Sequence, residues 1–342
     1  MISSIEKKVD FLRLSELIDA VATLQVIGST EREITGLSQD SRKVRAGDLF
    51  FCIRGVQVDG HRYLKDAVAA GCVAAVVEYI PDDVPEGITL IQVQNVSSAL
   101  KAIAGKFYDY PDGKLKIIGV IGTNGKTTST FLMKSILEAA GHRVGLIGTI
   151  INLVGDEEIT INDGSVHNTT PGALELQQLF AKMVEAGAEY VVMEVSSHSI
   201  HQGRVDGIPF CGGIFTNITQ DHLDYHGTFE EYLRVKTKFF ADLPSTSWAS
   251  INEDDEHAEY ILSRTAAKVL TYGIRRDTDV KAENIRLTPQ GAMYQAKTPQ
   301  GMMELNLHLT GYFNVYNSLG VLTAALSLGI PLDIIKVGLE RV

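Results

Sequence analysis

The sequence predicts an α/β protein, with an N-terminal mixed α/β domain followed by a larger domain built on a mostly parallel sheet. From Lys114 onward, apolar strand-like segments alternate with amphipathic helical ones, as in a parallel sheet covered on both faces. Before that point short strands and helices are mixed, and Tyr110–Gly113 contains a Pro and a Gly that interrupt regular structure. We therefore place one domain at residues 1–112 and a second at 113–342.

The elements follow from hydrophobic spacing. In the first domain, buried strands are predicted at 48–53 and 73–77, and helices at 63–70 and 97–108. In the second, strands are predicted at 117–121, 144–150, 190–195 and 212–218, and helices at 126–141, 172–186 and 228–240. Beyond Trp248 we expect a more antiparallel region with strands at 269–274, 280–287 and 302–309, then helices at 314–328 and 331–339.

Composition excludes several classes of function. The formal charge of −11, without an offsetting block rich in Lys and Arg, argues against a nucleic-acid partner. No apolar run reaches the roughly 20 residues of a membrane span, and Met1–Asp10 is too polar for a signal peptide. Three cysteines without paired metal spacing fit a reducing compartment. We expect a cytoplasmic protein that does not insert into membranes.

A short apolar strand at Ile117–Ile121 breaks into a glycine turn that ends in Gly-Lys-Thr-Thr. A strand, a glycine-rich bend and a helix in succession build a phosphate cradle, because backbone N–H groups and the positive end of the helix point at the anion. Lys126 would supply a cation for the outer phosphates, and the Thr127 hydroxyl could complete a Mg²⁺ shell. Val120 stands where the general pattern has glycine, so the loop is a variant of the form G-T-N-G-K-T. The alternative is an ordinary strand-to-helix turn.

Other predicted strand ends also carry polar groups, and ligands of such sheets bind beyond the carboxyl ends of the strands. Glu194 closes a buried strand and needs a partner, either a magnesium–triphosphate or a nearby Lys or Arg. The following loop, Thr216–His226, holds two histidines and two aspartates, which suits either metal coordination or a solvated loop. Lys236, in the next helix, is by default a surface lysine. Asn168–Pro171 precedes a helix and suits an anion or a plain helix start.

Taken together, these segments resemble the Mur ligase family of peptidoglycan-precursor amide ligases. The matching motifs are GTNGKTT (122–128), NTTP (168–171), MEVSSHSIHQGR (193–204), TNITQDHLDYHGT (216–228), GYFNVYNSLG (311–320), DSR (40–42) and GDLFFCIRG (47–55). DHLDYHG followed by a helix with Lys236, combined with NTTP, most resembles the third ligase of that pathway. The resemblance implies an ATP- and Mg²⁺-dependent enzyme that adds a diamino acid to UDP-N-acetylmuramoyl-L-alanyl-D-glutamate through an acyl phosphate.

Carried over residue by residue, the resemblance implies catalytic roles for Lys126, Lys236 and His222, and metal ligation by Thr127, Glu194, His222 and a carbamylated Lys236. The implied ATP-binding residues are Gly122, Thr123, Asn124, Gly125, Lys126, Thr127, Thr128, Asn314 and Asn317. The implied residues for the UDP precursor are Ser41, Gln57, Val58, Asn168, Thr169, Thr170, Ser196, Gln202 and Arg204.

Family members continue into a third domain that binds the incoming amino acid. This sequence ends where that domain would begin, so we expect the C-terminal domain to be absent and leave the diamino acid open, favouring meso-diaminopimelate over L-lysine. We expect a monomer. The alternatives are a truncated, non-catalytic fragment that binds ATP and the UDP-sugar, and another ligase of the same fold, such as folylpolyglutamate or cyanophycin synthetase. The DSR-containing first domain argues against the latter.

Overall fold

The computed structural model describes residues 11–55, 58–161 and 168–342. The chain divides into two compact units, each with its own sheet and core. The first comprises Met1–Pro111 together with Ala173–Ala181, and the second comprises Asp112–Gly172 and Lys182–Val342. Most of the helix α5 (Ala173–Glu185), as far as Ala181, therefore groups with the first unit, although the rest of the chain after Pro111 belongs to the second.

The first unit is built on a sheet whose described strands lie in the order β2-β7-β6-β5-β4. β4 to β7 run parallel, and β2 is antiparallel to β7. The strands are β2 (Thr23–Ile27), β4 (Gly36–Ser38), β5 (Asp48–Phe51), β6 (Ala74–Val77) and β7 (Thr89–Val93), and β1 (Leu12–Arg13) pairs separately with β3 (Glu33–Ile34). The helices are α1 (Leu14–Ile18), α2 (Leu64–Ala69) and α3 (Val96–Phe107). β5, β6, α2 and α3 confirm the predicted elements.

The second unit contains one long sheet, with the described strands in the order β11-β10-β9-β12-β8-β13-β14-β15-β16-β17-β18. Its strands are β8 (Lys116–Ile121), β9 (Val144–Ile147), β10 (Asn152–Val154), β11 (Glu157–Glu158), β12 (Tyr190–Val195), β13 (Phe210–Phe215), β14 (Trp248–Asn252), β15 (Lys268–Gly273), β16 (Val280–Thr288), β17 (Gly291–Thr298) and β18 (Gly301–Leu307). In that order the run from β9 to β16 is parallel. This was predicted for β9, β12, β8 and β13, whereas β14 was not predicted as a strand.

The expected antiparallel region after Trp248 is only partly right. β15 pairs in parallel with both β14 and β16, and antiparallel pairing on this side begins with β16 and β17. The expectation failed because a strand's apolar pattern shows that it is buried but not which way its neighbours run. β17 was not predicted at all, because its inward-facing positions include Ala292 and Ala296, and alanine is a weak strand former.

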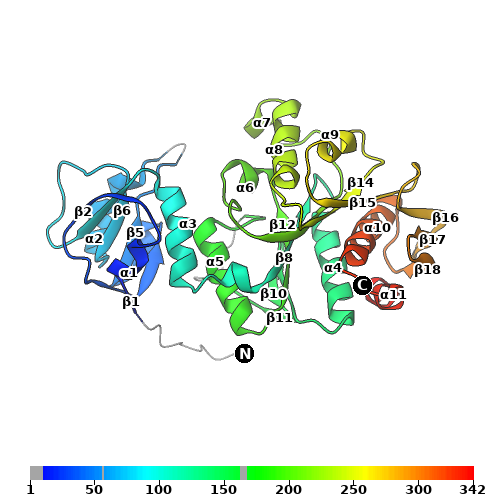
Figure 1. The fold of residues 1–342 in the computed structure, drawn as a ribbon, viewed down its shortest axis with the longest axis horizontal. Coiled ribbons are helices and arrows are strands. Elements are labelled where there is room, and N and C mark those ends of the chain that lie inside the picture. The colour runs from blue at the N-terminus through cyan, green and yellow to red at the C-terminus, as the bar shows by residue number, and fades with distance from the viewer. Residues whose placement is uncertain (1–10, 56–57, 162–167) are drawn as a thin grey trace. The chain divides into compact units, whose positions relative to one another are not determined.

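Helices cover both faces of this sheet, as the ribbon in Figure 1 shows. The helices of the second unit are α4 (Lys126–Ala139), α6 (Ser197–His201), α7 (Leu223–His226), α8 (Phe229–Ala241), α9 (Ala258–Leu262), α10 (Tyr312–Ser327) and α11 (Leu332–Leu339). On one face, α4, α10 and α11 share a core with inward residues such as Ile118 and Ile214. On the other, Phe239 of α8 lies so close to Gly119 and Gly213 that a Cβ at either would fall within 2.6 Å of its ring. These glycines let α8 approach the centre of the sheet.

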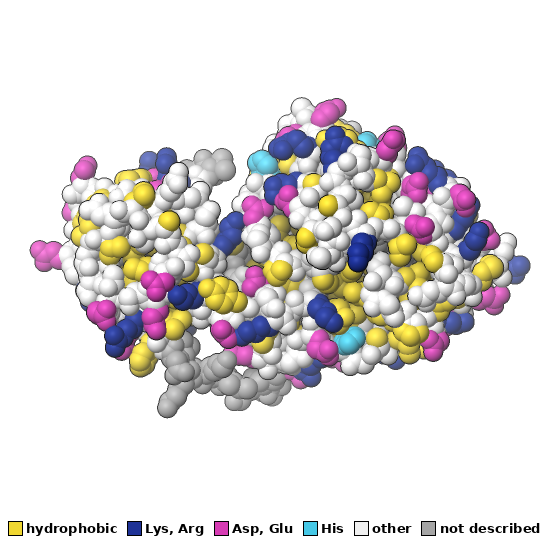
Figure 2. All heavy atoms as spheres, in the orientation of Figure 1, with side chains coloured by type: hydrophobic (Ala, Val, Ile, Leu, Met, Phe, Trp, Pro, Cys, Tyr) yellow, Lys and Arg dark blue, Asp and Glu magenta, His cyan; other side chains and the backbone are white. Residues whose placement is uncertain are grey.

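Because β8, β12, β13, β14 and β15 are parallel, the loops that follow them meet at one edge of the sheet. The predicted phosphate loop follows β8, Glu194 lies near the end of β12, and the Thr216–His226 segment follows β13. In the parts of the chain that are described, no helix is both long and apolar enough to cross a membrane. The face in Figure 2 shows Lys and Arg side chains interspersed with Asp and Glu.

Candidate functional site

The phosphate loop lies between β8 and α4. Gly125 caps the helix with a φ of 85°, in the left-handed region that favours glycine. The Lys126 Nζ folds back over the loop and donates to the carbonyls of Gly122 and Thr123 at 2.8 and 2.9 Å. Burial lowers the pKa of Lys126, while the charges of Glu194 and Asp221 act in the opposite direction. The lysine is thus held beside the loop without a carboxylate bonded to it among the described residues.

The segment after β13 braces this loop. Asn217 accepts from the Asn124 backbone N–H at 3.0 Å and donates back to the Asn124 carbonyl at 3.0 Å, and the Thr216 hydroxyl donates to that carbonyl at 2.7 Å. The contact is close enough to require glycine, since a Cβ on Gly122 would lie 1.8 Å from the Thr216 Oγ1. Thr127 and Thr128 lie in the first turn of α4.

Glu194 is a buried carboxylate at the centre of the edge, 1% exposed. It accepts from the Thr127 hydroxyl at 2.9 Å, and from the Thr149 backbone N–H and hydroxyl at 3.0 and 3.1 Å. Within the described ranges it forms no ion pair with Lys or Arg, so the structure does not support the alternative of a simple salt bridge. A buried carboxylate next to the phosphate-loop threonine fits a magnesium ion, a hard cation that prefers oxygen ligands. Sequence reasoning missed Thr149, which lies 45 residues away in the chain.

Lys236 is not a surface residue, so the default expectation was wrong. It is 2% exposed, with its Nζ 4.5 Å from the centre of the Tyr232 ring and 3.5 Å from the Thr123 Oγ1. Burial and the neighbouring Lys126 hold the pKa of Lys236 well below its ordinary value, against the opposing charges of Asp221 and Asp255. A lowered pKa makes the amine easier to deprotonate, and a deprotonated amine is a nucleophile that can accept CO₂, so the site fits the carbamate that the resemblance implies.

His222 caps the start of α7 with a left-handed φ of 52° and is exposed, its Nε2 3.5 Å from Asp221 Oδ2. It belongs to a cluster of aromatic side chains: the rings of His198 and His222 are 4.9 Å apart, and those of His198 and His226 are 5.7 Å apart. Burial is the main cause that lowers the pKa of both His198 and His226. Across the described segments, three or more His, Cys, Asp or Glu side chains do not gather into a metal-binding group.

Residues expected to hold the precursor come together on the same edge. The Thr170 hydroxyl donates to the Glu194 carbonyl at 2.9 Å and accepts from the Ser196 backbone N–H at 3.0 Å. Arg204 donates to the Thr170 carbonyl at 2.9 Å and to the Gln202 Oε1 at 2.9 and 2.5 Å. Tyr225, which was not singled out, accepts from Gln202 at 3.0 Å and lies 3.0 Å from the His201 Nδ1.

The remaining predicted precursor residues are not part of this network. Asn168 and Thr169 lie just before it in the chain, with Asn168 exposed. Ser41 begins a short 3₁₀ turn in the first unit, and Val58, which is exposed, belongs to the same unit. Gln57 lies outside the described residues.

Beside the phosphate loop is a cavity of about 770 Å³, lined at the carboxyl ends of β13, β14 and β15. Asn317 lies on its wall against Gly125, and donates to the Asn314 Oδ1 at 3.2 Å. Asn314 in turn donates to the Thr310 carbonyl at 2.9 Å and is not itself among the lining residues. Phe313, 67% exposed, offers an aromatic face at the mouth. The cavity could hold a nucleoside next to the phosphate cradle.

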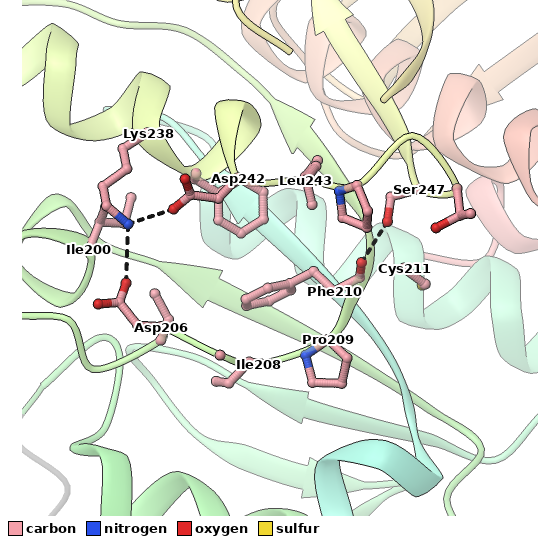
Figure 3. Close-up of a pocket in the computed structure, with 15 residues that line it drawn as sticks. Ile200, Asp206, Ile208, Pro209, Phe210, Cys211, Lys238, Asp242, Leu243 and Ser247 are labelled. Atoms are coloured by element: carbon pink, nitrogen blue, oxygen red, sulfur yellow. Dashed lines mark hydrogen bonds and ion pairs between the residues drawn. The ribbon is translucent and has the colours of Figure 1, made fainter. Parts of the chain in front are cut away.

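A second cavity, of about 740 Å³, opens at the amino-terminal ends of β13 and β14, away from the phosphate loop. Figure 3 shows its apolar lining around Phe210 and Leu243, with Lys238 held between Asp206 and Asp242. The lysine Nζ lies 3.2 and 2.5 Å from these carboxylates, which neutralise its charge. The chemistry of this lining suits a phosphate ligand less well than the carboxyl edge does.

Comparison with known proteins gives the same family over both units. The profile of the Mur ligase middle domain matches residues 120–325, and that of the Mur ligase family, catalytic domain, matches residues 33–108. Over 332 residues the chain is 42% identical to the UDP-N-acetylmuramoyl-L-alanyl-D-glutamate–2,6-diaminopimelate ligase of Clostridium tetani, covering 96% of this chain and 67% of that protein. It is 43% identical to the enzyme of the same name from Bacillus cereus, covering 95% of this chain and 66% of the relative.

A solved structure of a ligase with that name superimposes with a TM-score of 0.80 at 26% identity, covering 97% of this chain and 67% of the other. The chain thus spans about two thirds of the length of these relatives. The matched profiles cover both units, and the phosphate loop, the buried Glu194 and the buried Lys236 all lie within them. The chain belongs to the Mur ligase family.

Proposed function

We propose that this chain carries the ATP and UDP-precursor sites of an ATP-dependent amide ligase of peptidoglycan precursor synthesis. The ligase adds a diamino acid to UDP-N-acetylmuramoyl-L-alanyl-D-glutamate. The observation that carries the proposal is the convergence, at one sheet edge, of a phosphate loop, a buried carboxylate without an ion-pair partner among the described residues and a buried lysine of lowered pKa. A sheet edge that served only to stabilise the fold would not require these three features together.

On the ATP side, the backbone from Gly122 to Gly125 and the start of α4 cradle the phosphates. Lys126 leaves the loop carbonyls to contact the outer phosphates, which compensates the cost of burying its charge. Thr127 and Glu194 would hold Mg²⁺, which would neutralise phosphate charge and stabilise the transferring phosphoryl group. Asn314 and Asn317 support the nucleoside, since Asn317 lies on the wall of the adjoining cavity.

Lys236 acts as a carbamate in this proposal. Its neutral amine adds to CO₂, forming a nitrogen–carbon bond while an N–H proton leaves to water, and the side chain becomes an anion. Together with His222, this carbamate would hold a second Mg²⁺. The like charge of Lys126, which disfavours an ammonium at Lys236, favours an anion there.

On the precursor side, the network of Thr170, Ser196, Gln202 and Arg204 binds the muramoyl-dipeptide, with Asn168 and Thr169 beside it. Arg204 is already fixed by Gln202 and Thr170, so its guanidinium is preorganised for a carboxylate. Ser41, Gln57 and Val58 of the first unit take the UDP end.

A carboxylate is a poor acyl donor, so it must be activated before an amine can attack it. The γ-phosphoryl group moves to a carboxylate oxygen of the D-glutamyl residue, and ADP leaves. The amine of the diamino acid then attacks the acyl carbon, and phosphate departs. The residues at the sheet edge bring two anions together and offset their repulsion, so positioning and electrostatics supply most of the catalysis. We favour diaminopimelate as the amine, because the relatives named above are diaminopimelate ligases.

The direct test is to incubate the purified chain with Mg-ATP, UDP-N-acetylmuramoyl-L-alanyl-D-glutamate and either diaminopimelate or L-lysine, and to assay the UDP-tripeptide. Formation of tripeptide with one amine supports the whole proposal. Calorimetry separates the alternative of a non-catalytic fragment, which would bind ATP and the precursor and form no tripeptide. Binding of neither ligand would contradict both.

A further inference from the structure

A buried hydroxyl pair joins the phosphate loop to the helix that carries Lys236. The Thr123 Oγ1 and the Tyr232 OH are 3.0 Å apart, although 109 residues separate them in the chain. Tyr232 is 1% exposed and lies one helical turn before Lys236 on α8. It has no part in the function proposed above.

Thr123 is also tied to the loop that follows β13. Its Oγ1 accepts from the Thr219 backbone N–H at 3.0 Å and lies 3.2 Å from the Thr219 carbonyl. The single Thr123 proton can point to that carbonyl or away from it, and either hydroxyl of the pair can be the donor.

Both members of the pair contact the Lys236 amine. Its Nζ lies 4.5 Å from the centre of the Tyr232 ring and 3.5 Å from the Thr123 Oγ1. The ring therefore packs along the lysine, while the hydroxyl fixes the threonine that faces the amine. The charged groups that act on Lys236 are Lys126, Asp221 and Asp255, and none of them is bonded to its Nζ within the described ranges.

We propose that Tyr232 is a positioning residue that holds Thr123 and the Lys236 amine together, so that carbamylation of Lys236 and the ordered phosphate loop stabilise one another. The inference rests on the proposed carbamylation of Lys236. When the amine adds to CO₂, the new carboxylate forms next to the Thr123 hydroxyl, a hydrogen-bond group that Tyr232 keeps in place. The tyrosine hydroxyl acts through the threonine and does not itself touch the reacting atoms.

The test measures the carbamate directly, with ¹³C NMR of the full chain titrated with ¹³C-bicarbonate and without nucleotide. Lys236→Ala identifies the carbamate signal by its loss. Tyr232→Phe keeps the ring and removes only the hydroxyl. We expect it to need about fivefold more bicarbonate for half-maximal signal, as for the loss of one hydrogen bond. The matched control is Tyr294→Phe. Tyr294 lies in β17, is buried like Tyr232, and its hydroxyl forms a 2.7 Å hydrogen bond with the Ser318 hydroxyl. It should titrate like the wild type.

The outcomes separate the inference from the proposed function. An unchanged titration in Tyr232→Phe overturns the role of Tyr232 and leaves the carbamate standing. A wild type without a Lys236-dependent signal overturns the carbamate, and the inference with it. If Tyr232→Phe does not fold, Thr123→Val removes the same junction from the loop side and should weaken the carbamate, whereas Thr123→Ser should restore it. An equal loss in Thr123→Val and Thr123→Ser would contradict the proposal.

Discussion

Replacing Gly125 with alanine tests the packing of the phosphate loop against α10. Gly125 has a φ of 85°, and a Cβ there would lie 2.2 Å from the Asn317 Oδ1. Left-handed backbone costs an L-residue about 1–2 kcal/mol. Relieving the clash requires Asn317 to move, which disturbs its 3.2 Å bond to Asn314, and overpacking of this kind adds about 1–3 kcal/mol.

Gly141→Ala is the matched control. Gly141 follows the C-terminal cap of α4, at the other end of the helix from Gly125. It has a φ of 89°, and a Cβ added there would have nothing within 4 Å. It should show the backbone cost alone, about 1–2 kcal/mol. The difference between the two variants therefore isolates the contact with Asn317, at about 1–3 kcal/mol.

Urea denaturation followed by circular dichroism measures the free energy of unfolding of each variant, and calorimetry measures Mg-ATP binding. Gly125→Ala should also bind Mg-ATP at least about tenfold more weakly, a loss of about 1.4 kcal/mol, whereas Gly141→Ala should bind like the wild type. Equal destabilisation by the two substitutions, with equal nucleotide affinity, would refute the argument that Gly125 is required by its contact with Asn317.

Four further substitutions, at three residues, test separate parts of the site. Lys126→Ala should abolish detectable Mg-ATP binding, because the cation beside the loop is lost; calorimetry that finds wild-type affinity would exclude this role. Lys236→Ala should cripple turnover and be partly rescued by short-chain carboxylates, and normal activity would refute the carbamate. In CO₂-free buffer, Lys236→Met should also remove a pH dependence of stability. Folding lowers the pKa of Lys236 below its ordinary value of 10.5. In the pH range between the lowered pKa and 10.5, the unfolded chain therefore binds more protons than the folded chain. The free energy of unfolding of the wild type should rise with pH in that range, relative to that of the variant. If the urea midpoints of the wild type and Lys236→Met changed equally with pH, this expectation would be contradicted. Arg204→Lys should weaken binding of the UDP precursor about tenfold and leave ATP affinity unchanged, since Arg204 is held by Gln202 and Thr170.

Most of the correct predictions came from residues that are close together in the sequence. The phosphate loop could be read from sequence because its strand, glycines and helix are consecutive, and the positions of Glu194 and of the Thr216–His226 loop followed from the rule that parallel strands end at one edge. The pairing direction of β15 could not be read, because its apolar pattern is the same in either orientation.

Lys236 shows a signal that was present and overlooked. Tyr232, Lys236 and Phe240 are four residues apart along α8, so the lysine lies on the helix's apolar stripe and faces the core. Contacts across long stretches of chain are different, because nothing near Thr123 or Glu194 in sequence points to Tyr232 or Thr149. Only the fold brings those groups together.

We propose that the buried Glu194 and the phosphate loop form one magnesium–nucleotide site. Calorimetric titration of a non-hydrolysable ATP analogue, with and without Mg²⁺, into the wild type and Glu194→Gln tests it most directly. We predict that the wild type binds the analogue more tightly with Mg²⁺, and that Glu194→Gln loses most of that dependence because the carboxylate beside Thr127 is gone. Equal magnesium dependence in the two proteins, or no binding by the folded wild type, would contradict a magnesium–nucleotide site at Glu194.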